Sequence, residues 1–241
     1  MVQALPRWTE YRVPDTLPDD TEESIVGTEW HQEAISALTG MLREAARRHG
    51  AAWGACNQIA LTGLHRADGR PYDPRPDVMA LARPLPSGAL SSIALADAGA
   101  PLFIAEVASR GAVGDDIGEK QRVYEAIGVQ EYIVFDPDGV LLSTPLLAWR
   151  LANGAYVPWR AEADGSWYSA ALEVSILATQ PLLGVRDRTG RDIDPPYRAW
   201  ERVDELEQRM RAIDMLEQRV RDLEGELRRL REGSDSSRSS R

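Results

Sequence analysis

The chain has 241 residues, 43% of them hydrophobic, which is enough for one globular domain with an appendage or for two small domains. Its formal net charge of −10 argues against a protein that binds nucleic acid through a broad basic face. A small basic channel is still compatible with this net charge. The single cysteine, Cys56, excludes an internal disulfide and a cysteine-based metal cluster.

The N-terminal part of the chain predicts an extended segment followed by a helix. Residues 1–22 are rich in Pro, Asp and Thr and lack the basic-then-apolar pattern of a secretory signal, so we expect a loosely attached segment and a cytoplasmic protein. From about residue 28 to residue 48, apolar residues recur at steps of three and four, which predicts a helix. No run approaches the roughly 18 apolar residues of a membrane span, so no membrane association is expected.

Four apolar runs in the middle of the chain predict strands. They cover residues 54–63, 77–81, 101–107 and 131–136. The last two runs are apolar except for acidic residues at or near their ends, as is typical of central strands covered on both faces. A stretch rich in Pro, Gly and Ser at 83–101 predicts a long loop, and a helix over 115–127 is expected to end at Gly128.

Further strands are predicted after the fourth run. Residues 147–159 read as a hairpin around Asn153-Gly154, because both turn residues of such a hairpin must accept positive φ. Another strand is expected at about 167–177. The order of elements predicts an α/β (α+β) domain over residues 23–197 with a mixed central sheet rather than a regular βαβ repeat.

The composition changes after Tyr197. Apolar residues alternate by three and four among acidic residues and arginines, with one phase slip near Ile213, which predicts a long coiled-coil helix over 198–232. The Ser-rich residues 233–241 are expected to be disordered. We interpret the helix as the basis of a homodimer, and the alternative is a single helix that folds back on the body.

Lys120 is the only lysine in the chain, and every other basic residue counted with it is an arginine. At about 100° per residue, Lys120 lies in the middle of the apolar face of the predicted helix 115–127. A lysine on the face that packs against a sheet is costly unless it meets acidic partners or water in a pocket. The position therefore predicts a functional amine.

Two acidic residues are candidates for its partners. Asp77 begins a predicted strand, and Glu106 lies near the C-terminal end of another, in an otherwise apolar run. If these strands are neighbours, the two carboxylates can converge and, with a backbone carbonyl and waters, form an oxygen site for Mg²⁺ or Mn²⁺. A lysine beside them can orient an attacking water and balance phosphate charge, whereas an arginine stays charged and has a different shape.

Several short segments carry a resemblance to a known family. They are "RPDVMAL", "FIAEVAS" and "DIGEKQRVYEAIGVQEYIVFDP". In order, they contain Pro76-Asp77, Glu106-Val107, Asp116-Ile117, Lys120, Tyr124, Gly128-Val129, Glu131-Tyr132 and Asp136-Pro137. This succession resembles the Uma-two family of restriction-type endonucleases, over about residues 28–160 and most closely over 101–137.

The resemblance implies a PD-(D/E)XK restriction-endonuclease-like core and Mg²⁺-dependent hydrolysis of DNA. It implies that Asp77 and Glu106 bind the metal and that Lys120 completes the catalytic set. In the wider nuclease pattern the lysine lies two residues after the strand glutamate, where this chain has Ala108. The resemblance implies that the lysine role has moved to the helix.

Other readings of the same residues stay open. Lys120 can bridge to Asp116 or Glu119 on a helix surface, and Glu106 can be a structural acid at a strand end. Related folds sometimes add an acid from the first helix, for which Glu23 and Glu29 are candidates. The chain can also be a catalytically silent interaction protein that keeps the nuclease fold and works through its C-terminal coiled coil.

Overall fold

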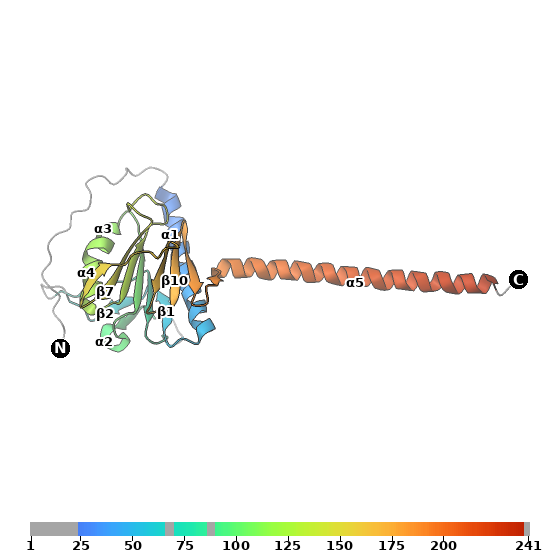
Figure 1. The fold of residues 1–241 in the computed structure, drawn as a ribbon, viewed down its shortest axis with the longest axis horizontal. Helices are drawn as coiled ribbons and strands as arrows, with labels where there is room; N and C mark the ends of the chain where they lie inside the picture. Colours follow the sequence, from blue (N-terminus) through green and yellow to red (C-terminus); the bar gives the residue numbers. More distant parts are fainter. Residues whose placement is uncertain (1–23, 66–69, 86–89, 239–241) are drawn as a thin grey trace. The chain divides into compact units, whose positions relative to one another are not determined.

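We describe the fold from a computed structural model, in which residues 24–65, 70–85 and 90–238 are described (Figure 1). The extended segment expected at 1–22 lies outside these residues. The chain divides into two compact units, Met1–Pro195 and Pro196–Arg241, and each is described by itself. In the described part of the chain, no helix has both the length and the apolar character needed to cross a membrane.

The first unit contains one long helix, several short helical segments and twelve strands in the residues described. Its helical elements are α1 (Ser24–His49), α2 (Leu95–Ala98), α3 (Val113–Asp115), a π-helical turn η1 (Asp116–Lys120) and α4 (Gln121–Ile127). Its strands are β1 (Gly54–Asn57), β2 (Ala60–Thr62), β3 (Val78–Leu81), β4 (Ser92–Ala94), β5 (Phe103–Val107), β6 (Glu131–Phe135), β7 (Leu146–Ala152), β8 (Ala155–Pro158), β9 (Ser166–Ser169), β10 (Val174–Thr179), β11 (Leu182–Asp187) and β12 (Asp192–Ile193).

The central sheet is mixed, as the sequence predicts. Its strand order is β1-β3-β5-β6-β7-β8, with β5 and β6 parallel and the other neighbours antiparallel. A parallel pair needs a crossover connection, and α3, η1 and α4 provide it between β5 and β6. Gly128 ends this helical segment with φ 86°, in the left-handed conformation that a glycine adopts at little cost.

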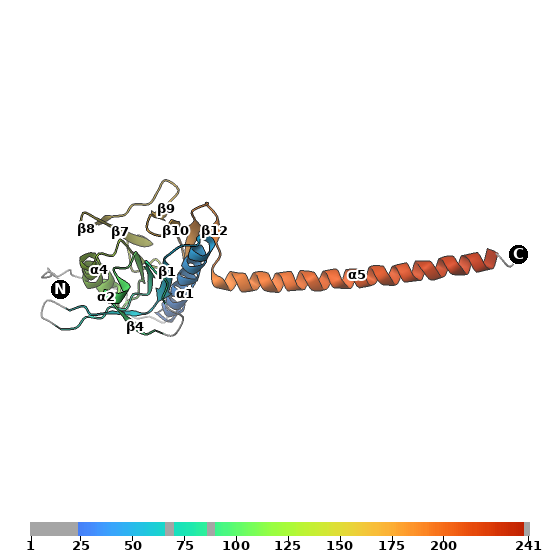
Figure 2. The same cartoon turned by 90° about the horizontal axis from the view of Figure 1, so that it is seen from below.

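One face of the central sheet packs against α1 and a second sheet. The second sheet has the order β12-β11-β10-β9 and is antiparallel. Apolar residues of α1 such as Ile35, Leu38 and Leu42 form one buried cluster with Phe103 of β5 and Val185 of β11. Figure 2 shows α1 beside β1, β10 and β12. The apolar face of this long amphipathic helix is thus buried, because it has apolar partners in both sheets.

The opposite face of the central sheet packs against α4. Because side chains alternate between the faces of a strand, Phe103 and Ala105 of β5 face α1, while Ile104 and Glu106 face α4. Val123 and Tyr124 of α4 belong to this second cluster and are fully buried. Glu106 is therefore a carboxylate inside an apolar layer, at 0% exposure.

Two predicted elements differ from the structure in the N-terminal half. The run 54–63 forms two strands, because Gln58 adopts φ 51° and its N–H donates to the carbonyls of Pro76 (3.1 Å) and Asp77 (3.2 Å). β2 leaves the central sheet there and pairs in parallel with β4. The predicted loop 83–101 contains β4 and α2, which are too short to produce a periodic pattern in the sequence.

The C-terminal half of the first unit confirms the hairpin and adds strands. Asn153 (φ 55°) and Gly154 (φ 82°) form the turn between β7 and β8. The strand predicted at 167–177 is wrong as one element, because the chain reverses at Glu173 (φ 56°) and the run divides into β9 and β10. β11 and β12 were not predicted from the sequence, although β11 alternates between buried and half-buried residues.

The second unit is the single helix α5 (Pro196–Arg238). It extends past the boundary at 232 that the composition predicts, so the segment expected to be disordered is helical as far as Arg238. Gly and Ser lower helix propensity by only about 0.5–1 kcal/mol each, which does not stop a helix that is already propagating. Residues 239–241 lie outside the described part of the chain.

Candidate active site

Asp77 and Glu106 lie opposite each other at one end of the β3–β5 pair. The antiparallel register places Val78 against Ala105, so the residue before Val78 faces Glu106. The backbone N–H of Asp77 donates to Glu106 Oε2 (3.2 Å), and the N–H of Val107 donates to Asp77 Oδ2 (2.8 Å). Each carboxylate is thus held by a backbone donor next to the other one.

Lys120 reaches the two acids from η1. Its Nζ lies 3.1 Å from Glu106 Oε2 and 2.8 Å from Asp116 Oδ1, and its side chain is 19% exposed. The structure therefore brings Asp77, Glu106 and Lys120 into one cluster. Ala108, at the position where the wider nuclease pattern has its lysine, is buried, and its N–H donates to Phe135 O (2.7 Å).

Two buried tyrosines donate hydrogen bonds to residues of this cluster. Tyr124 of α4 donates its hydroxyl proton to Glu106 Oε1 (2.7 Å), and Tyr132 of β6 donates to the backbone oxygen of Asp116 (2.7 Å). Their rings meet edge to face, with centroids 5.2 Å apart. Both hydroxyls are thereby satisfied in the core, and they fix Glu106 and the π-helical turn in place.

The cluster contains more acidic groups than basic ones. Burial, together with the nearby Asp116 and Asp77, raises the pKa of Glu106 to about 8, against the lowering effect of Lys120. Burial likewise raises the pKa of Asp116 to about 6. Burial alone would lower the pKa of Lys120, but the two carboxylates outweigh it and hold this pKa above its ordinary value. Three carboxylates therefore share one ammonium group.

Two residues of the site were not predicted from the sequence. Asp116, which the sequence offers only as a surface partner of Lys120, is 1% exposed and pairs with Lys120 inside the cluster. A π-helical turn adds a residue to the turn, so a projection at 100° per residue misplaces its members. His31 of α1 has its Nε2 3.8 Å from Asp77 Oδ1. No local pattern could have found a contact between residues so far apart.

The two carboxylates of the cluster are suitable ligands for a hard divalent cation, although they are fewer than a complete set of protein ligands. In residues 24–65, 70–85 and 90–238, no group of three or more His, Cys, Asp or Glu side chains is arranged to hold a metal ion. Asp77 and Glu106 supply two carboxylates, and Mg²⁺ commonly binds through one or two carboxylates while it keeps several waters. The surplus negative charge fits such an ion. Of the other acids considered, Glu23 lies outside the described residues, and the side chain of Glu29 is likewise not described.

Other acidic residues in the segments that carry the family resemblance stabilise the fold. Asp136, after β6, accepts hydrogen bonds from the backbone N–H groups of 138, 139, 141 and 142 and so holds the loop before β7. Glu131 binds residues of the second sheet and Arg150 of β7. These positions have a structural task that the resemblance alone does not reveal.

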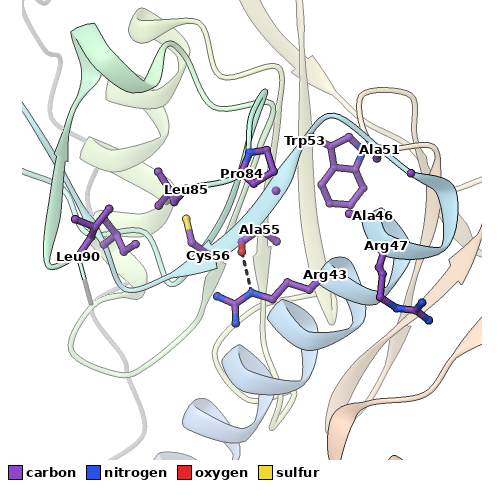
Figure 3. A pocket seen from close by; sticks show the side chains of 13 residues that line it. Arg43, Ala46, Arg47, Ala51, Trp53, Ala55, Cys56, Pro84, Leu85 and Leu90 are labelled. Carbon is purple, nitrogen blue, oxygen red and sulfur yellow. Dashed lines mark hydrogen bonds between the residues drawn. The ribbon is translucent and has the colours of Figure 1, made fainter. Parts of the chain in front are cut away.

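A separate pocket of about 630 Å³ lies at the C-terminal end of α1 (Figure 3). It is lined by Arg43, Trp53 and Cys56 among others, and the Nε of Arg43 donates to Ala55 O (2.9 Å). None of the three clustered site residues lines it. Burial raises the pKa of Cys56 to about 11, so this cysteine stays a thiol and is not an activated nucleophile.

Comparisons with known proteins give two similarities. A family model described as "Uma2: Putative restriction endonuclease" matches residues 17–176. A solved structure, described as a putative nuclease belonging to DUF820 from Anabaena variabilis ATCC 29413, shares 14% sequence identity with a TM-score of 0.37. The similarity covers 50% of this chain and 62% of that chain, so the present chain spans less than two thirds of it. No curated protein matches.

Proposed function

Because the chain belongs to the Uma2 family of restriction-type endonucleases, we propose that it is a metal-dependent endonuclease that hydrolyses DNA phosphodiester bonds. The family match extends over Asp77, Glu106 and Lys120, and the three residues form one cluster. The proposal rests on one observation above all: a buried glutamate on a central strand contacts the only lysine of the chain.

In this proposal Asp77 and Glu106 hold Mg²⁺ or Mn²⁺. The bound ion supplies Lewis-acid polarisation of the phosphate and lowers the pKa of a coordinated water. Asp77 is positioned for this role because its Oδ2 is fixed by the N–H of Val107, while its Oδ1 faces His31. Glu106 is held in place by Tyr124 and Lys120, and it would give up the proton that its raised pKa favours in order to accept a cation.

Lys120 orients the attacking water and stabilises the charge on the phosphate. Asp116 and Glu106 hold its ammonium group from two sides, which limits the positions that the amine can take. A lysine presents its charge at one atom on a flexible stem, whereas the guanidinium of an arginine is a larger planar group with a different donor geometry. This difference is our explanation for a lysine at position 120 in a chain that otherwise uses arginine.

The substrate, assembly and location in this proposal follow from the family and from the sequence. DNA is the substrate that a restriction-type endonuclease cuts, and cutting both strands of a duplex needs two active sites. We therefore propose a homodimer that forms through the C-terminal helix. The cytoplasmic location expected from the sequence stays a prediction.

Cleavage of supercoiled plasmid and of single-stranded DNA in the presence of Mg²⁺ or Mn²⁺ tests the proposal. We expect cleavage by the wild-type chain, none after chelation, and a loss of about 10³-fold or more in Asp77→Asn, Glu106→Gln and Lys120→Ala. Glu162→Gln is the matched control, because Glu162 is exposed and belongs to no part of the cluster. Cleavage that persists in all three site variants would rule out this site.

Calorimetric titration with Mn²⁺ separates the enzyme from a silent scaffold. We expect wild-type protein to bind the ion and Glu106→Gln to bind it at least tenfold more weakly, because the charged ligand is lost. A wild-type chain that binds no divalent ion and cleaves no DNA would favour the catalytically silent interaction protein.

A further inference from the structure

The helix α5 presents an apolar stripe to solvent. Over residues 201–224, where its side chains are described, every residue is exposed. The apolar ones include Val203 (44% exposed), Leu206 (58%), Met210 (65%), Ile213 (54%), Leu216 (66%), Val220 (53%) and Leu223 (42%). A contiguous apolar stripe of this length on a helix is typical of a surface that binds another chain.

The spacing of the stripe assigns heptad positions. Val203, Leu206, Met210 and Ile213 follow one another at steps of three, four and three, which are a, d, a and d positions. Leu216, Val220 and Leu223 follow at steps of four and three, which are d, a and d positions. The step of three between Ile213 and Leu216 is a break in the heptad that locally changes the winding of a coiled coil without moving the seam off the helix face.

The residues that flank the seam carry a consistent charge pattern. The g positions hold Arg202, Arg209 and Arg219, and the e positions five residues later hold Glu207, Asp214 and Glu224. In a parallel, in-register coiled coil, each g residue faces the e residue five positions later on the partner helix. Three g positions with described side chains would thus each meet an acid, and the sequence continues the rule at Glu226 and Arg231.

The same residues disfavour an antiparallel pairing of two α5 helices. In an antiparallel pair, g positions face g positions and e positions face e positions. Arginines would then lie beside arginines and acids beside acids along the described part of the seam. Opposite charges at these positions set partner and orientation, whereas like charges disfavour a pairing.

We propose that α5 binds the α5 of a second copy of this chain as a parallel, in-register two-stranded coiled coil. The pairing contributes Arg202–Glu207, Arg209–Asp214 and Arg219–Glu224 contacts between the copies, each repeated by the two-fold symmetry. Because the helices run in the same direction, both copies of Pro196 lie at the same end of the coiled coil. This assembly deepens the homodimer of the proposed function, but its charge rule does not depend on catalysis.

A charge-exchange experiment on the full-length chain tests orientation. We expect sedimentation to show a dimer for the wild type and dimerisation about tenfold weaker for Arg209→Glu and for Asp214→Arg, since each change places like charges together twice in a symmetric dimer. An equimolar mixture of the two variants should recover the dimer. In the mixed dimer the introduced glutamate of one copy faces the introduced arginine of the other, and the native Arg209 and Asp214 form the second pair. Arg211→Glu, outside the e and g positions, is the matched control.

Cross-linking tests register. In a Cys56→Ser background, Met210→Cys should form a disulfide-linked dimer on oxidation, since equivalent a positions meet only in a parallel, in-register pair. Gln208→Cys, on the outer face, should not. A wild-type chain that stays monomeric at high micromolar concentration, a mixture that fails to recover the dimer, or equal cross-linking at both positions would overturn the proposal. None of these outcomes depends on whether the chain cleaves DNA.

Discussion

Two buried glutamates on neighbouring strands of the central sheet have opposite surroundings. Glu106 lies near the end of β5 and faces α4, whereas Glu131 begins β6 and lies on the face of β6 that Ile133 and Phe135 share. Both are almost completely buried, at 0% and 2% exposure, and each has one basic partner at a similar distance. Lys120 Nζ lies 3.1 Å from Glu106, and Arg150 Nη2 lies 3.2 Å from Glu131.

Glu106 and Glu131 differ in their other neighbours. Glu131 accepts hydrogen bonds from the Ser169 hydroxyl and from the N–H of Ala170 (3.1 Å), so its partners besides arginine are neutral groups of the second sheet. Arg150 is itself held over the ring of Trp159, 4.7 Å from its centroid. Glu106 instead has two further carboxylates near it, and both raise its pKa. Burial of a charge alone therefore does not distinguish the two glutamates, whereas the convergence of like charges at Glu106 does, and groups perturbed in this way cluster at functional sites.

The largest difference in DNA cleavage should appear when the basic partner of each glutamate, Lys120 or Arg150, is replaced by the other basic residue type. Lys120→Arg keeps the positive charge between Glu106 and Asp116, so we expect a folded chain whose DNA cleavage falls about 10²-fold or more, because the charge and the proton donor are misplaced. Arg150→Lys should leave cleavage unchanged. Plasmid cleavage rates of the two variants provide the measurement, and equal rates would remove the special role of the amine.

Deleting the two carboxylates should affect stability unequally. Glu131→Ala leaves Arg150 and a backbone donor without this partner, and we expect the free energy of unfolding to fall by about 1–3 kcal/mol, since the half-exposed Arg150 can still be solvated. Glu106→Gln should cost less than about 1 kcal/mol at pH 7, because the raised pKa already keeps a proton on this group in the folded chain. Urea unfolding of both variants checks this order, and a larger loss in Glu106→Gln would reverse the assignment of roles.

The pH dependence of stability should reflect the raised pKa of Glu106, together with the pKa of Glu131, which burial also raises. Without divalent ions, the pKa of Glu106 is about 8 in the folded chain and 4.5 ordinarily, so the folded state binds the extra proton between these values. The free energy of unfolding should therefore fall as the pH rises from about 4.5 to about 8, and Asp116, with its pKa raised to about 6, adds to the fall in the lower part of this window.

Glu106→Gln should remove the part of this slope between pH 6 and 8. A divalent ion competes with the same proton, so the affinity of the wild type for Mn²⁺ should increase up to about pH 8. Urea midpoints at several pH values with a chelator, and Mn²⁺ titrations without one, measure the two effects. A slope that is unchanged in Glu106→Gln would contradict the raised pKa.

The smallest expected effect belongs to Tyr124. Its hydroxyl lowers the pKa of Glu106, so Tyr124→Phe should raise this pKa further and weaken Mn²⁺ binding at pH 7 by a few-fold. The midpoint of the pH dependence of binding should shift upward, while the fold is retained because the ring still packs against Tyr132. Tyr168→Phe, at an exposed tyrosine, is the control.

The sequence predicts the central sheet and the convergence of the site for physical reasons that are local. Largely apolar runs identify β5 and β6, and the alternation along β3 and β5 places Asp77 and Glu106 on one face once the strands are neighbours. Lys120 stands out because it is the only lysine and lies on an apolar face. The alternative pairing of Lys120 with Asp116 is also found, but inside the cluster and not on a helix surface, because Asp116 is buried.

The parts that the sequence does not predict depend on long-range contacts or on irregular backbone. His31 and Asp77 meet only because α1 packs along the central sheet. β4 and β12 are short strands that form against partners distant in the chain, so their local sequences carry little periodicity. The division of 54–63 depends on a positive φ at Gln58, a residue type that gives no local indication of it.

The π-helical turn η1 gives the site an unusual sensitivity to changes in chain length. Each residue of an α-helix advances about 100°, so deleting Gly118 would turn Asp116 and the crossover before it away from the pocket relative to Tyr124. Deletions of this kind should therefore disable the site where many substitutions on the outer surface of the same helix are tolerated. In a lineage, loss of a single codon at this turn would be enough to displace Asp116 from the cluster, while Lys120, Tyr124 and the strands stay as they are.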